Sequence, residues 1–332
     1  MNVDALPTPA LVIDLDALES NLATMARTLP GARLRPHVKA HKCTALARAQ
    51  AAHGHPGFTC ATPREVLGMA AAGLGDDLLL ANETLDAQRL AAMARLQPAV
   101  TVAVDSPQTI DAAAEAGIVR CLIDVNVGLN RCGAAIVDAA ALARRARERG
   151  IEVRGVMGYE GHLMMVRPRE ERARRVAEAM ALLRQAHDAV GGAIVSAGGT
   201  GTYDLHEHTG VTEIQAGSYA LMDHDYAQLG QPFGQALYVL GTVISVSPGH
   251  AVADVGLKAL AMDHGNPQLP GAQVRSCSDE HMVFVPGSPV RPGDRVRVIP
   301  GHVDPTMAMH EAASLVRGQA VVDRWAIDLR GW

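Results

Sequence analysis

The feature that most constrains the fold is a repeated alternation between short apolar runs and longer stretches with a helical period. We predict that the short runs are strands: Leu34–Lys39, Phe58–Ala61, Asp77–Ala81, Val100–Val104, Cys121–Val125, Val153–Tyr159, Ala193–Ala197 and Glu213–Ala216. The predicted helices are Asp16–Thr28, Thr44–His53, Pro63–Ala72, Leu85–Leu96, Pro107–Ala116, Ala134–Gly150 and Pro168–Val190. About eight βα units favour an α/β fold built on a closed (β/α)8 barrel. An open doubly wound sheet is the alternative, but no Gly-rich dinucleotide motif follows the first strand.

The pattern changes after Gly230, where short strand-like runs are separated by Pro-Gly turns. These runs are Val239–Val246, Ala251–Val255, Met282–Pro286, Asp294–Ile299 and Ala320–Trp325. We therefore expect a barrel over residues 16–230 and a C-terminal all-β domain over residues 231–332. The strand-like run 8–15 precedes the first helix and is expected to join the β domain. A chain of 332 residues is long enough for both domains.

Composition and charge exclude several classes of protein. The net charge is −5 and the arginines are scattered, which argues against a nucleic acid or an anionic membrane as partner. The 5 cysteines are dispersed and form no C-x-x-C pair, as is typical of a reducing compartment. The first residues lack the features of a signal peptide, and no apolar run is long enough to span a membrane. We expect a cytoplasmic protein.

Lysine occurs only at Lys39, Lys42 and Lys258. Two of these lie at the end of the first predicted barrel strand, the edge at which barrel enzymes carry catalytic groups. A lysine inside an apolar barrel mouth has a lowered amine pKa and can act as a nucleophile. Taken alone, the pair is explained equally well as ordinary surface lysines at a strand end.

Glycine-rich segments follow the last two predicted barrel strands, at 196–202 and 215–219. Loops after strands seven and eight form the usual phosphate site of such barrels, where backbone amides meet an anion. Thr200 and Ser218 can add hydroxyl donors. Each segment alone fits a simple turn, but their joint position favours a phosphate site.

The C-terminal domain contains the segment Gly301-His302-Val303-Asp304-Pro305-Thr306. In an extended segment, His302 and Asp304 would point to the same side and could share one divalent ion. A His-x-Asp pair is common, and polar residues at a strand end are its more frequent meaning.

Three further residues lie in loops after the fifth and sixth predicted strands. Arg131 can point into the barrel mouth or form a salt bridge within its loop. Tyr159 can pack beside a cofactor ring or simply cap the barrel. His162, close to Tyr159 in the sequence, offers an imidazole at the same edge.

The segment Thr8–Asn21 and the motif Arg35-Pro36-His37-Val38-Lys39-Ala40-His41-Lys42 resemble the opening of the fold-type III enzymes that use pyridoxal 5'-phosphate (PLP). The most similar branch is the metal-activated D-threonine aldolase and D-serine dehydratase family. The resemblance continues to about Glu311, so it covers nearly the whole chain. It implies an alanine-racemase-like barrel with a second β domain, a homodimer, and a small-molecule D-amino acid as substrate.

The resemblance also implies roles for individual residues. Lys39 matches the lysine that forms the Schiff base with PLP. Arg131 matches the arginine near the phenolic oxygen of the cofactor, and Tyr159 an aromatic residue beside it. The phosphate-binding positions correspond to Gly199, Thr200, Gly217, Ser218 and Tyr219. The metal ligands correspond to His302 and Asp304.

The second metal ligand distinguishes the branches of this family. The dehydratases resemble one another in a His-x-Cys pair, whereas Asp304 followed by Pro305-Thr306 resembles the aldolases. A carboxylate ligand suits Mn²⁺ or Mg²⁺ better than Zn²⁺. We therefore expect a lyase that cleaves D-threonine-like D-β-hydroxy-α-amino acids to glycine and an aldehyde, with His162 or a metal hydroxide as the base.

Other functions remain as alternatives. A dehydratase would eliminate the β-hydroxyl of D-serine or D-hydroxyaspartate to give a keto acid and ammonia. A non-catalytic PLP-carrier protein shares the barrel but generally lacks a second β domain. A racemase needs no metal pair, and a sugar-phosphate aldolase that uses Lys39 would not need His302 and Asp304.

Overall fold

The computed structural model describes residues 1–332, which divide into two compact bodies. The barrel body comprises Met25–Lys39, Leu46–Gly217 and Gly331–Trp332. The sheet body comprises Met1–Thr24, Ala40–Ala45 and Ser218–Arg330. The sheet body therefore begins earlier in the chain than the change of pattern at Gly230, and it includes the N-terminal segment.

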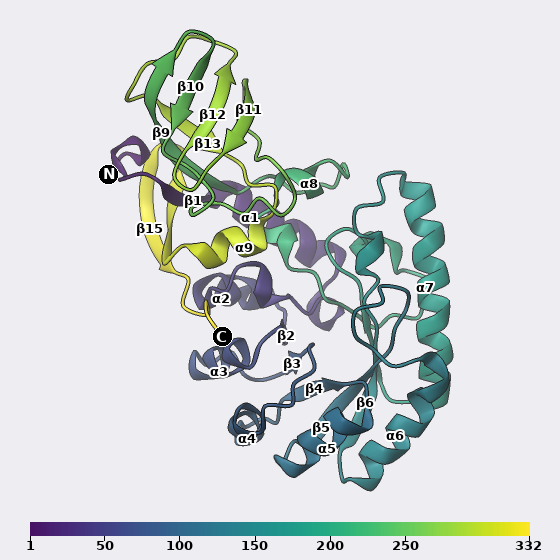
Figure 1. Ribbon diagram of the computed structural model, residues 1–332. Helices are drawn as coiled ribbons and strands as arrows, with labels where there is room; N and C mark the ends of the chain where they lie inside the picture. Colours follow the sequence, from purple (N-terminus) through teal and green to yellow (C-terminus); the bar gives the residue numbers. More distant parts are fainter. The chain divides into compact units, whose positions relative to one another are not determined.

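The barrel body contains a parallel sheet whose strands follow one another in chain order (Figure 1). Its strands are β2 (Phe58–Cys60), β3 (Leu78–Leu80), β4 (Thr101–Val104), β5 (Arg120–Asp124), β6 (Glu152–Met157), β7 (Ile194–Ala197) and β8 (Glu213–Ile214). Nearly all of their residues are buried, as expected for a parallel sheet covered on both faces. Each of these strands was predicted from the sequence, so the α/β barrel architecture is confirmed.

The predicted first strand, Leu34–Lys39, is not a regular strand. The segment forms two isolated parallel bridges instead, Leu34 with Ile214 and His37 with Thr59. These bridges connect the segment to β8 on one side and to β2 on the other, so it links the two edge strands of the sheet. Pro36 between them has no amide hydrogen, which interrupts a continuous ladder. A 3-10 helix, Val38–Ala40, then carries the chain out of the barrel.

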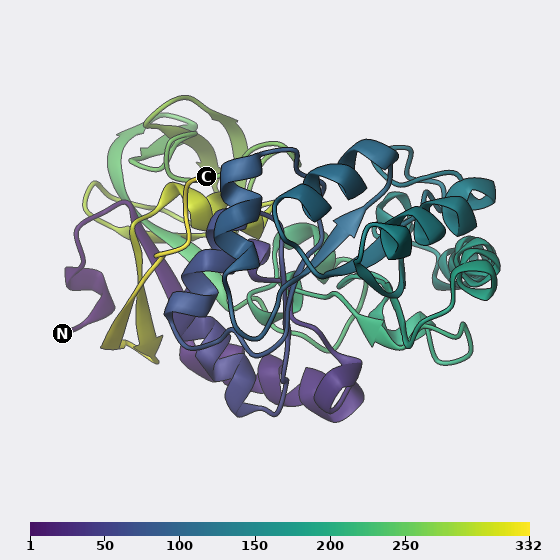
Figure 2. The same cartoon turned by 90° about the horizontal axis from the view of Figure 1, so that it is seen from below.

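Helices lie outside the strands of the barrel body (Figure 2). With α1, which spans the boundary at Thr24, the helices are α1 (Leu15–Thr28), α2 (Thr44–Ala52), α3 (Pro63–Ala71), α4 (Ala87–Ala94), α5 (Pro107–Glu115), α6 (Ala139–Glu148) and α7 (Arg169–Val190). Local signals start several of them. Thr62 caps α3 and Ser106 caps α5, each followed by a proline in the first turn.

The sheet body is built on an eight-stranded sheet with the order β11-β12-β10-β9-β1-β14-β15, and β13 pairs with β9. The strands are β1 (Ala10–Asp14), β9 (Leu237–Ser247), β10 (His250–Ala253), β11 (Ala272–Cys277), β12 (Met282–Pro286), β13 (Arg295–Val298), β14 (Ala312–Arg317) and β15 (Ala320–Ala326). The N-terminal strand β1 pairs antiparallel with β9 and parallel with β14. Each body has its own apolar core, for example Val12, Leu240 and Val316 in the sheet body.

The sheet body is not purely β. Two short helices, α8 (His224–Ala227) and α9 (Val303–Met309), lie within it. Strands β11 and β14 were not predicted. No residue of β11 is fully buried, and four consecutive residues of β14 are buried, so neither strand alternates between buried and exposed residues. No helix of the protein is both long and apolar enough to cross a lipid bilayer.

Candidate active site

The predicted cofactor residues of the barrel body lie where strands of the parallel sheet end. Lys39 follows the bridged segment, Arg131 follows β5, Tyr159 follows β6, and Gly199 follows β7. Because neighbouring strands run parallel, these loops emerge at the same edge of the sheet. This is the edge at which barrel enzymes place their catalytic groups.

Lys39 lies in the 3-10 helix that ends the bridged segment. Its backbone N–H points to Nδ1 of His37 at 3.5 Å, and its side chain is partly buried. His37 itself is only 9% exposed. The Lys39 backbone therefore lies beside the buried end of the bridged segment.

Arg131 and Tyr159 are brought together in the barrel body. The guanidinium carbon of Arg131 lies 5.5 Å from the centroid of the Tyr159 ring, which is a cation–π distance. The positive charge of Arg131 also favours the ionised form of the buried Asp124 carboxyl group.

The loop that carries Arg131 is organised by one asparagine side chain. Oδ1 of Asn126 accepts the amides of Gly128 at 2.8 Å and Asn130 at 3.3 Å, and its Nδ2 donates to Oδ1 of Asn130. Asn130 has φ of 57°, a conformation that asparagine tolerates better than most residues. The backbone that leads into Arg131 is thus fixed locally.

A buried carboxyl group, Asp124, ends β5 close to the Arg131 loop. Burial raises the pKa of Asp124 well above its usual range, and the negative charges of Glu83 and Asp105 raise it further. Arg131 opposes this effect but does not reverse it. The interaction of Asp124 with Glu83 and Asp105 was not predicted, because these carboxyl groups come from the ends of three different strands.

His162 lies at the same edge of the barrel and is exposed. Burial of its ring and the charge of Arg175 lower the pKa of His162, while Glu160 opposes them. The imidazole is accordingly neutral near pH 7 and can accept a proton. A Cβ added to Gly128 would lie 3.1 Å from the His162 ring, so this ring stands against the Arg131 loop.

The glycine-rich loop after β7 has no room for side chains. A Cβ on Gly199 would lie 2.9 Å from the sulfur of Met164, and one on Gly201 would lie 2.2 Å from the Met164 carbonyl oxygen. Gly198 adopts φ of +81°, which favours glycine. Such a loop lets a ligand approach the backbone closely, and the residues present fit a phosphate group.

Ser218 and Tyr219 belong to the sheet body, in a 3-10 helix that directly follows Gly217. The hydroxyl of Ser218 donates to Oδ1 of Asp304 at 3.1 Å. The Tyr219 side chain is fully buried and packs against Phe233 with ring centroids 5.7 Å apart. The structure thus connects the predicted phosphate position Ser218 to the predicted metal ligand Asp304.

The segment His302-Val303-Asp304 is not extended, contrary to the sequence-based expectation. His302 is the N-cap of α9, and Asp304 lies in the first turn of this helix. Pro305 explains the difference, because proline is well suited to the first turn of a helix. The carboxylate of Asp304 is also favoured near the positive end of the helix dipole.

His302 is held in a group that we call the His302 cluster, consisting of Asp263, His264 and His302. Nδ1 of His302 lies 2.6 Å from Oδ2 of Asp263, and the rings of His302 and His264 stack with centroids 4.1 Å apart. One ligand atom of each residue lies within 4.8 Å of the others. Two imidazoles and a carboxylate at this spacing fit a divalent cation.

The charge balance of the His302 cluster also suits a cation. Burial raises the pKa of Asp263, but the hydrogen bond and charge of His302, with the charge of His264, lower it more. The Asp263 carboxylate therefore stays ionised. Its hydrogen bond with Nδ1 of His302 also fixes the orientation of the imidazole ring.

Comparison with known proteins identifies the family. The model of the alanine racemase N-terminal domain matches residues 13–225, and that of a putative serine dehydratase domain matches residues 236–316. This chain belongs to the alanine-racemase-like family, in its D-threonine aldolase and D-serine dehydratase branch. Enzymes of this family depend on PLP.

Several members of the branch are similar over nearly their whole length. The chain is 36% identical to the D-threonine aldolase of an Arthrobacter species, over 98% of this chain and 93% of that protein. It is 33% identical to the 3-hydroxy-D-aspartate aldolase of Paracoccus denitrificans (100% and 94%). It is 28% identical to the D-threo-3-hydroxyaspartate dehydratase of a Delftia species (98% and 98%). The D-threonine aldolase structure from Filomicrobium marinum matches with a TM-score of 0.94 and 34% identity, over 99% of this chain and 97% of that one.

Two residues of the His302 cluster, Asp263 and His264, were not predicted from the sequence. Asp263 and His264 form a simple Asp-His-Gly turn sequence that predicts nothing by itself. His302 and Asp263 are 39 positions apart, so only the folded chain shows that they meet. The His-x-Asp motif places both expected ligands within one short segment.

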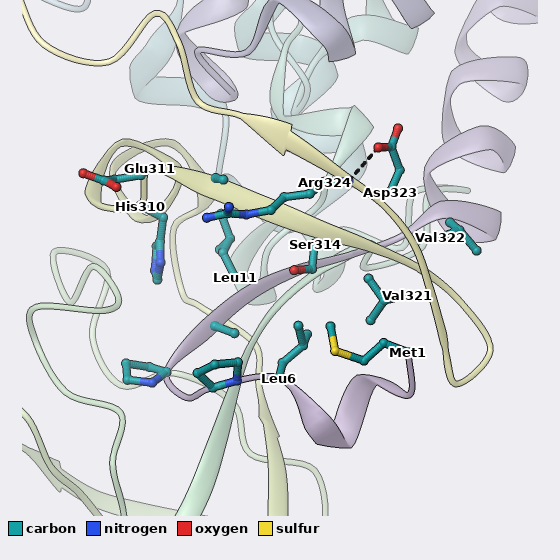
Figure 3. Close-up of a pocket in the computed structure, with 14 residues that line it drawn as sticks. Met1, Leu6, Leu11, His310, Glu311, Ser314, Val321, Val322, Asp323 and Arg324 are labelled. Atoms are coloured by element: carbon teal, nitrogen blue, oxygen red, sulfur yellow. Dashed lines mark hydrogen bonds between the residues drawn. The ribbon is translucent and has the colours of Figure 1, made fainter.

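A separate pocket in the sheet body contains none of the predicted site residues of this family member (Figure 3). Its volume is about 670 Å³, and it is lined by the N-terminal segment with β14 and β15, including Leu6, Leu11 and Val321. His310 at its edge is already engaged, since Nε2 lies 2.7 Å from the carbonyl oxygen of Ala259. Burial lowers the pKa of His310. The lining of the pocket contains no residue of the His302 cluster.

Proposed function

We propose that this protein is a PLP- and divalent-metal-dependent aldolase that cleaves D-β-hydroxy-α-amino acids to glycine and an aldehyde. The His302 cluster carries the proposal, because a racemase or a PLP carrier has no need for a group of cation-binding side chains. The similarity to D-threonine aldolases over nearly the whole chain supports the same conclusion.

In this proposal the barrel body holds the cofactor. PLP, when bound, supplies an electron sink for the bonding electrons at the α-carbon. Lys39 attaches it covalently, while Arg131 and Tyr159 flank its ring. Amides and hydroxyls of the phosphate-binding residues receive its phosphate, and these residues are Gly199, Thr200, Gly217, Ser218 and Tyr219.

The sheet body provides the metal ligands in this proposal. His302 and Asp304 would hold a divalent ion. Asp263 orients His302 through Nδ1, and His264 stands beside it as a further nitrogen donor. A divalent ion supplies a Lewis acid that lowers the pKa of a bound hydroxyl group. A carboxylate ligand favours Mn²⁺ or Mg²⁺ over Zn²⁺.

His162 is our candidate for the general base. Its lowered pKa keeps the imidazole neutral at physiological pH, as removal of the substrate β-hydroxyl proton requires. Its exposure leaves the ring accessible to a small molecule. We further propose a homodimer that acts on small D-amino acids.

The second candidate function is β-elimination by a dehydratase. The Delftia dehydratase supports it, because 28% identity extends over 98% of both chains. A dehydratase would release ammonia and a keto acid from the same class of D-amino acid. The products therefore distinguish the two activities directly.

The test incubates the purified protein with PLP, MnCl₂ and D-threonine, with and without EDTA. We expect glycine and acetaldehyde, both lost on chelation and restored by Mn²⁺. Ammonia with a keto acid would instead establish the dehydratase. Lys39→Ala should abolish the activity and the absorbance of bound cofactor, whereas the exposed Lys258→Ala should preserve both. Cofactor absorbance that survives in Lys39→Ala would refute the role of Lys39.

A further inference from the structure

The glycine-rich loop after β7 is held from the interior of the barrel body by one carboxylate. Glu160 is completely buried. Its Oε2 accepts the amide of Gly198 at 3.2 Å, and its Oε1 accepts the hydroxyl of Thr202 at 2.7 Å. The two ends of the loop, Gly198 and Thr202, are thus joined through a single side chain.

Thr202 extends this connection to the middle of the loop. Its hydroxyl donates to Glu160 and accepts the amide of Gly199 at 3.3 Å. Its own amide donates to the carbonyl oxygen of Gly199 at 3.2 Å. The conformation of Gly199 therefore depends on the Thr202 hydroxyl, which in turn depends on Glu160.

A buried carboxylate beside a phosphate site would normally repel the anion, and His206 provides the compensation. Nε2 of His206 lies 3.1 Å from Oε1 of Glu160, and His206 is only 2% exposed. Burial raises the pKa of Glu160, but the hydrogen bond and charge of His206 and the Thr202 hydroxyl lower it more. Gly198, Thr202 and His206 thus hydrogen-bond both oxygens of the Glu160 carboxylate.

Burying these polar side chains costs free energy of desolvation, so their presence in the interior needs an explanation. A buried ion pair is often no more stabilising than apolar residues of the same volume, but it can specify one conformation. Here the specified element is a loop of glycines, which loses more conformational entropy on ordering than any other sequence. Without fixed anchors, this loop would not present its peptide groups in one geometry.

We infer that Glu160, with Thr202 and His206, forms a positioning group that holds the Gly198–Thr202 loop ready for the cofactor phosphate. We call these three residues the Glu160 cluster. The inference rests on the proposed function, which makes this loop a phosphate site. It adds that affinity for the phosphate is set by residues that do not touch the cofactor, through the preorganised loop.

The test measures binding of PLP and of pyridoxal, which lacks the phosphate, to the full-length protein freed of its cofactor. Both aldehydes use Lys39, so the ratio of their dissociation constants isolates the phosphate contribution. The main variant is Thr202→Val, which keeps the shape of the side chain and removes the hydroxyl. Glu160→Gln is the second variant, because it keeps the volume but cannot accept all three donors.

The control is Thr59→Val, the same substitution at another fully buried threonine of the barrel body. The hydroxyl of Thr59 has no hydrogen-bond partner, so no connection is lost. We expect Thr202→Val and Glu160→Gln to weaken PLP about tenfold, since each leaves buried polar groups unpaired. Binding of pyridoxal should change less than about twofold by the same reasoning, and Thr59→Val should leave the ratio unchanged.

Three results would overturn the inference. An unchanged ratio of dissociation constants in Thr202→Val and Glu160→Gln would refute the positioning role and leave the phosphate site intact. Equal affinity of the wild-type protein for PLP and pyridoxal would refute the phosphate site itself. A parallel loss of both ligands in Thr202→Val would show a general structural role and would also contradict the inference.

Discussion

The two bodies of this protein each contain a histidine–carboxylate group, and the two groups differ in how far they are closed. In the Glu160 cluster every oxygen of the carboxylate is occupied by a donor within the barrel body, and the side chains of Glu160 and His206 are 0% and 1% exposed. In the His302 cluster, the side chains of Asp263 and His302 are 49% and 21% exposed. The same chemical groups are therefore closed to solvent in the barrel body and open to it in the sheet body.

The difference teaches how to distinguish a structural polar group from a binding one. A sealed group has spent its hydrogen-bonding capacity inside the protein, so its removal leaves buried charges or dipoles unpaired. An open group retains ligand atoms that face solvent, so its removal costs little stability but abolishes binding. Substitutions in a sealed group should consequently lower the stability of the fold more than substitutions in an open group.

The largest effect is expected for a second sealed group in the barrel body, centred on Arg35. Its Nε donates to Glu213 at 2.9 Å and its NH2 to Asp77 at 2.6 Å, and its side chain is 6% exposed. Arg35→Met should lower the free energy of unfolding by about 3–5 kcal/mol, because it leaves a buried carboxylate without its partner. Urea unfolding followed by circular dichroism measures this loss.

Arg145 provides the matched control for Arg35. It pairs with Asp111 at 2.5 Å, but its side chain is 44% exposed. Arg145→Met should lower the free energy of unfolding far less than Arg35→Met, as is usual for surface ion pairs. Equal losses in the two variants would contradict the distinction between sealed and open groups.

The next largest effect should come from metal binding at the open group. At a Mn²⁺ concentration one hundred times the dissociation constant, binding to the folded state stabilises it by about 2.7 kcal/mol. We expect MnCl₂ to raise the melting temperature of the wild-type protein and not that of His302→Ala. Differential scanning calorimetry with and without EDTA measures the shift.

His281→Ala is the control for the metal experiment, since His281 is an exposed histidine of the same body. It should retain the full shift with Mn²⁺. His264→Ala should show a smaller shift, because one nitrogen donor is lost. A full shift in His302→Ala would place the metal elsewhere in the chain.

The same contrast explains which features the sequence could predict. The barrel strands and helices follow from local periodicity and from caps such as Thr62 and Ser106. The Arg-Pro-His-x-Lys motif and the glycine loop could also be located, because each is contiguous. In contrast, His206 and Glu160 are 46 positions apart, so their contact depends on tertiary packing.

Two local errors have identifiable causes in single prolines. Pro36 breaks the first barrel strand into bridges, since it cannot donate to a ladder. Pro305 lies in the first turn of α9, which replaces the extended conformation that the His-x-Asp pattern suggested. Proline thus redirected the backbone next to both proposed centres of chemistry.

The smallest effect concerns a histidine that is sealed but has no carboxylate. His55 in the barrel body is 2% exposed; its Nδ1 lies 3.0 Å from the carbonyl oxygen of Gly31, and its Nε2 has no partner. Burial lowers the pKa of His55, the hydrogen bond to Gly31 opposes this, and His53 adds to the lowering.

The lowered pKa makes stability depend on pH in a definite direction. Above about pH 6.5, the usual value for histidine, His55 is neutral in both folded and unfolded chains and contributes no pH dependence. As the pH falls below this value, the unfolded chain takes up a proton first. Unfolding is therefore favoured, by at most about 1.4 kcal/mol per pH unit, until the folded-state pKa is reached.

His55→Asn should flatten this dependence, because the amide can still donate to Gly31 but cannot be protonated. Urea unfolding at a series of pH values between about 7 and 5 measures the slope, which should be shallower than in the wild type. His281→Asn, at an exposed position, should leave the slope unchanged. An unchanged slope in His55→Asn would mean that a sealed histidine without a carboxylate is protonated as easily as an open one, and the comparison of closed and open groups would lose its electrostatic basis.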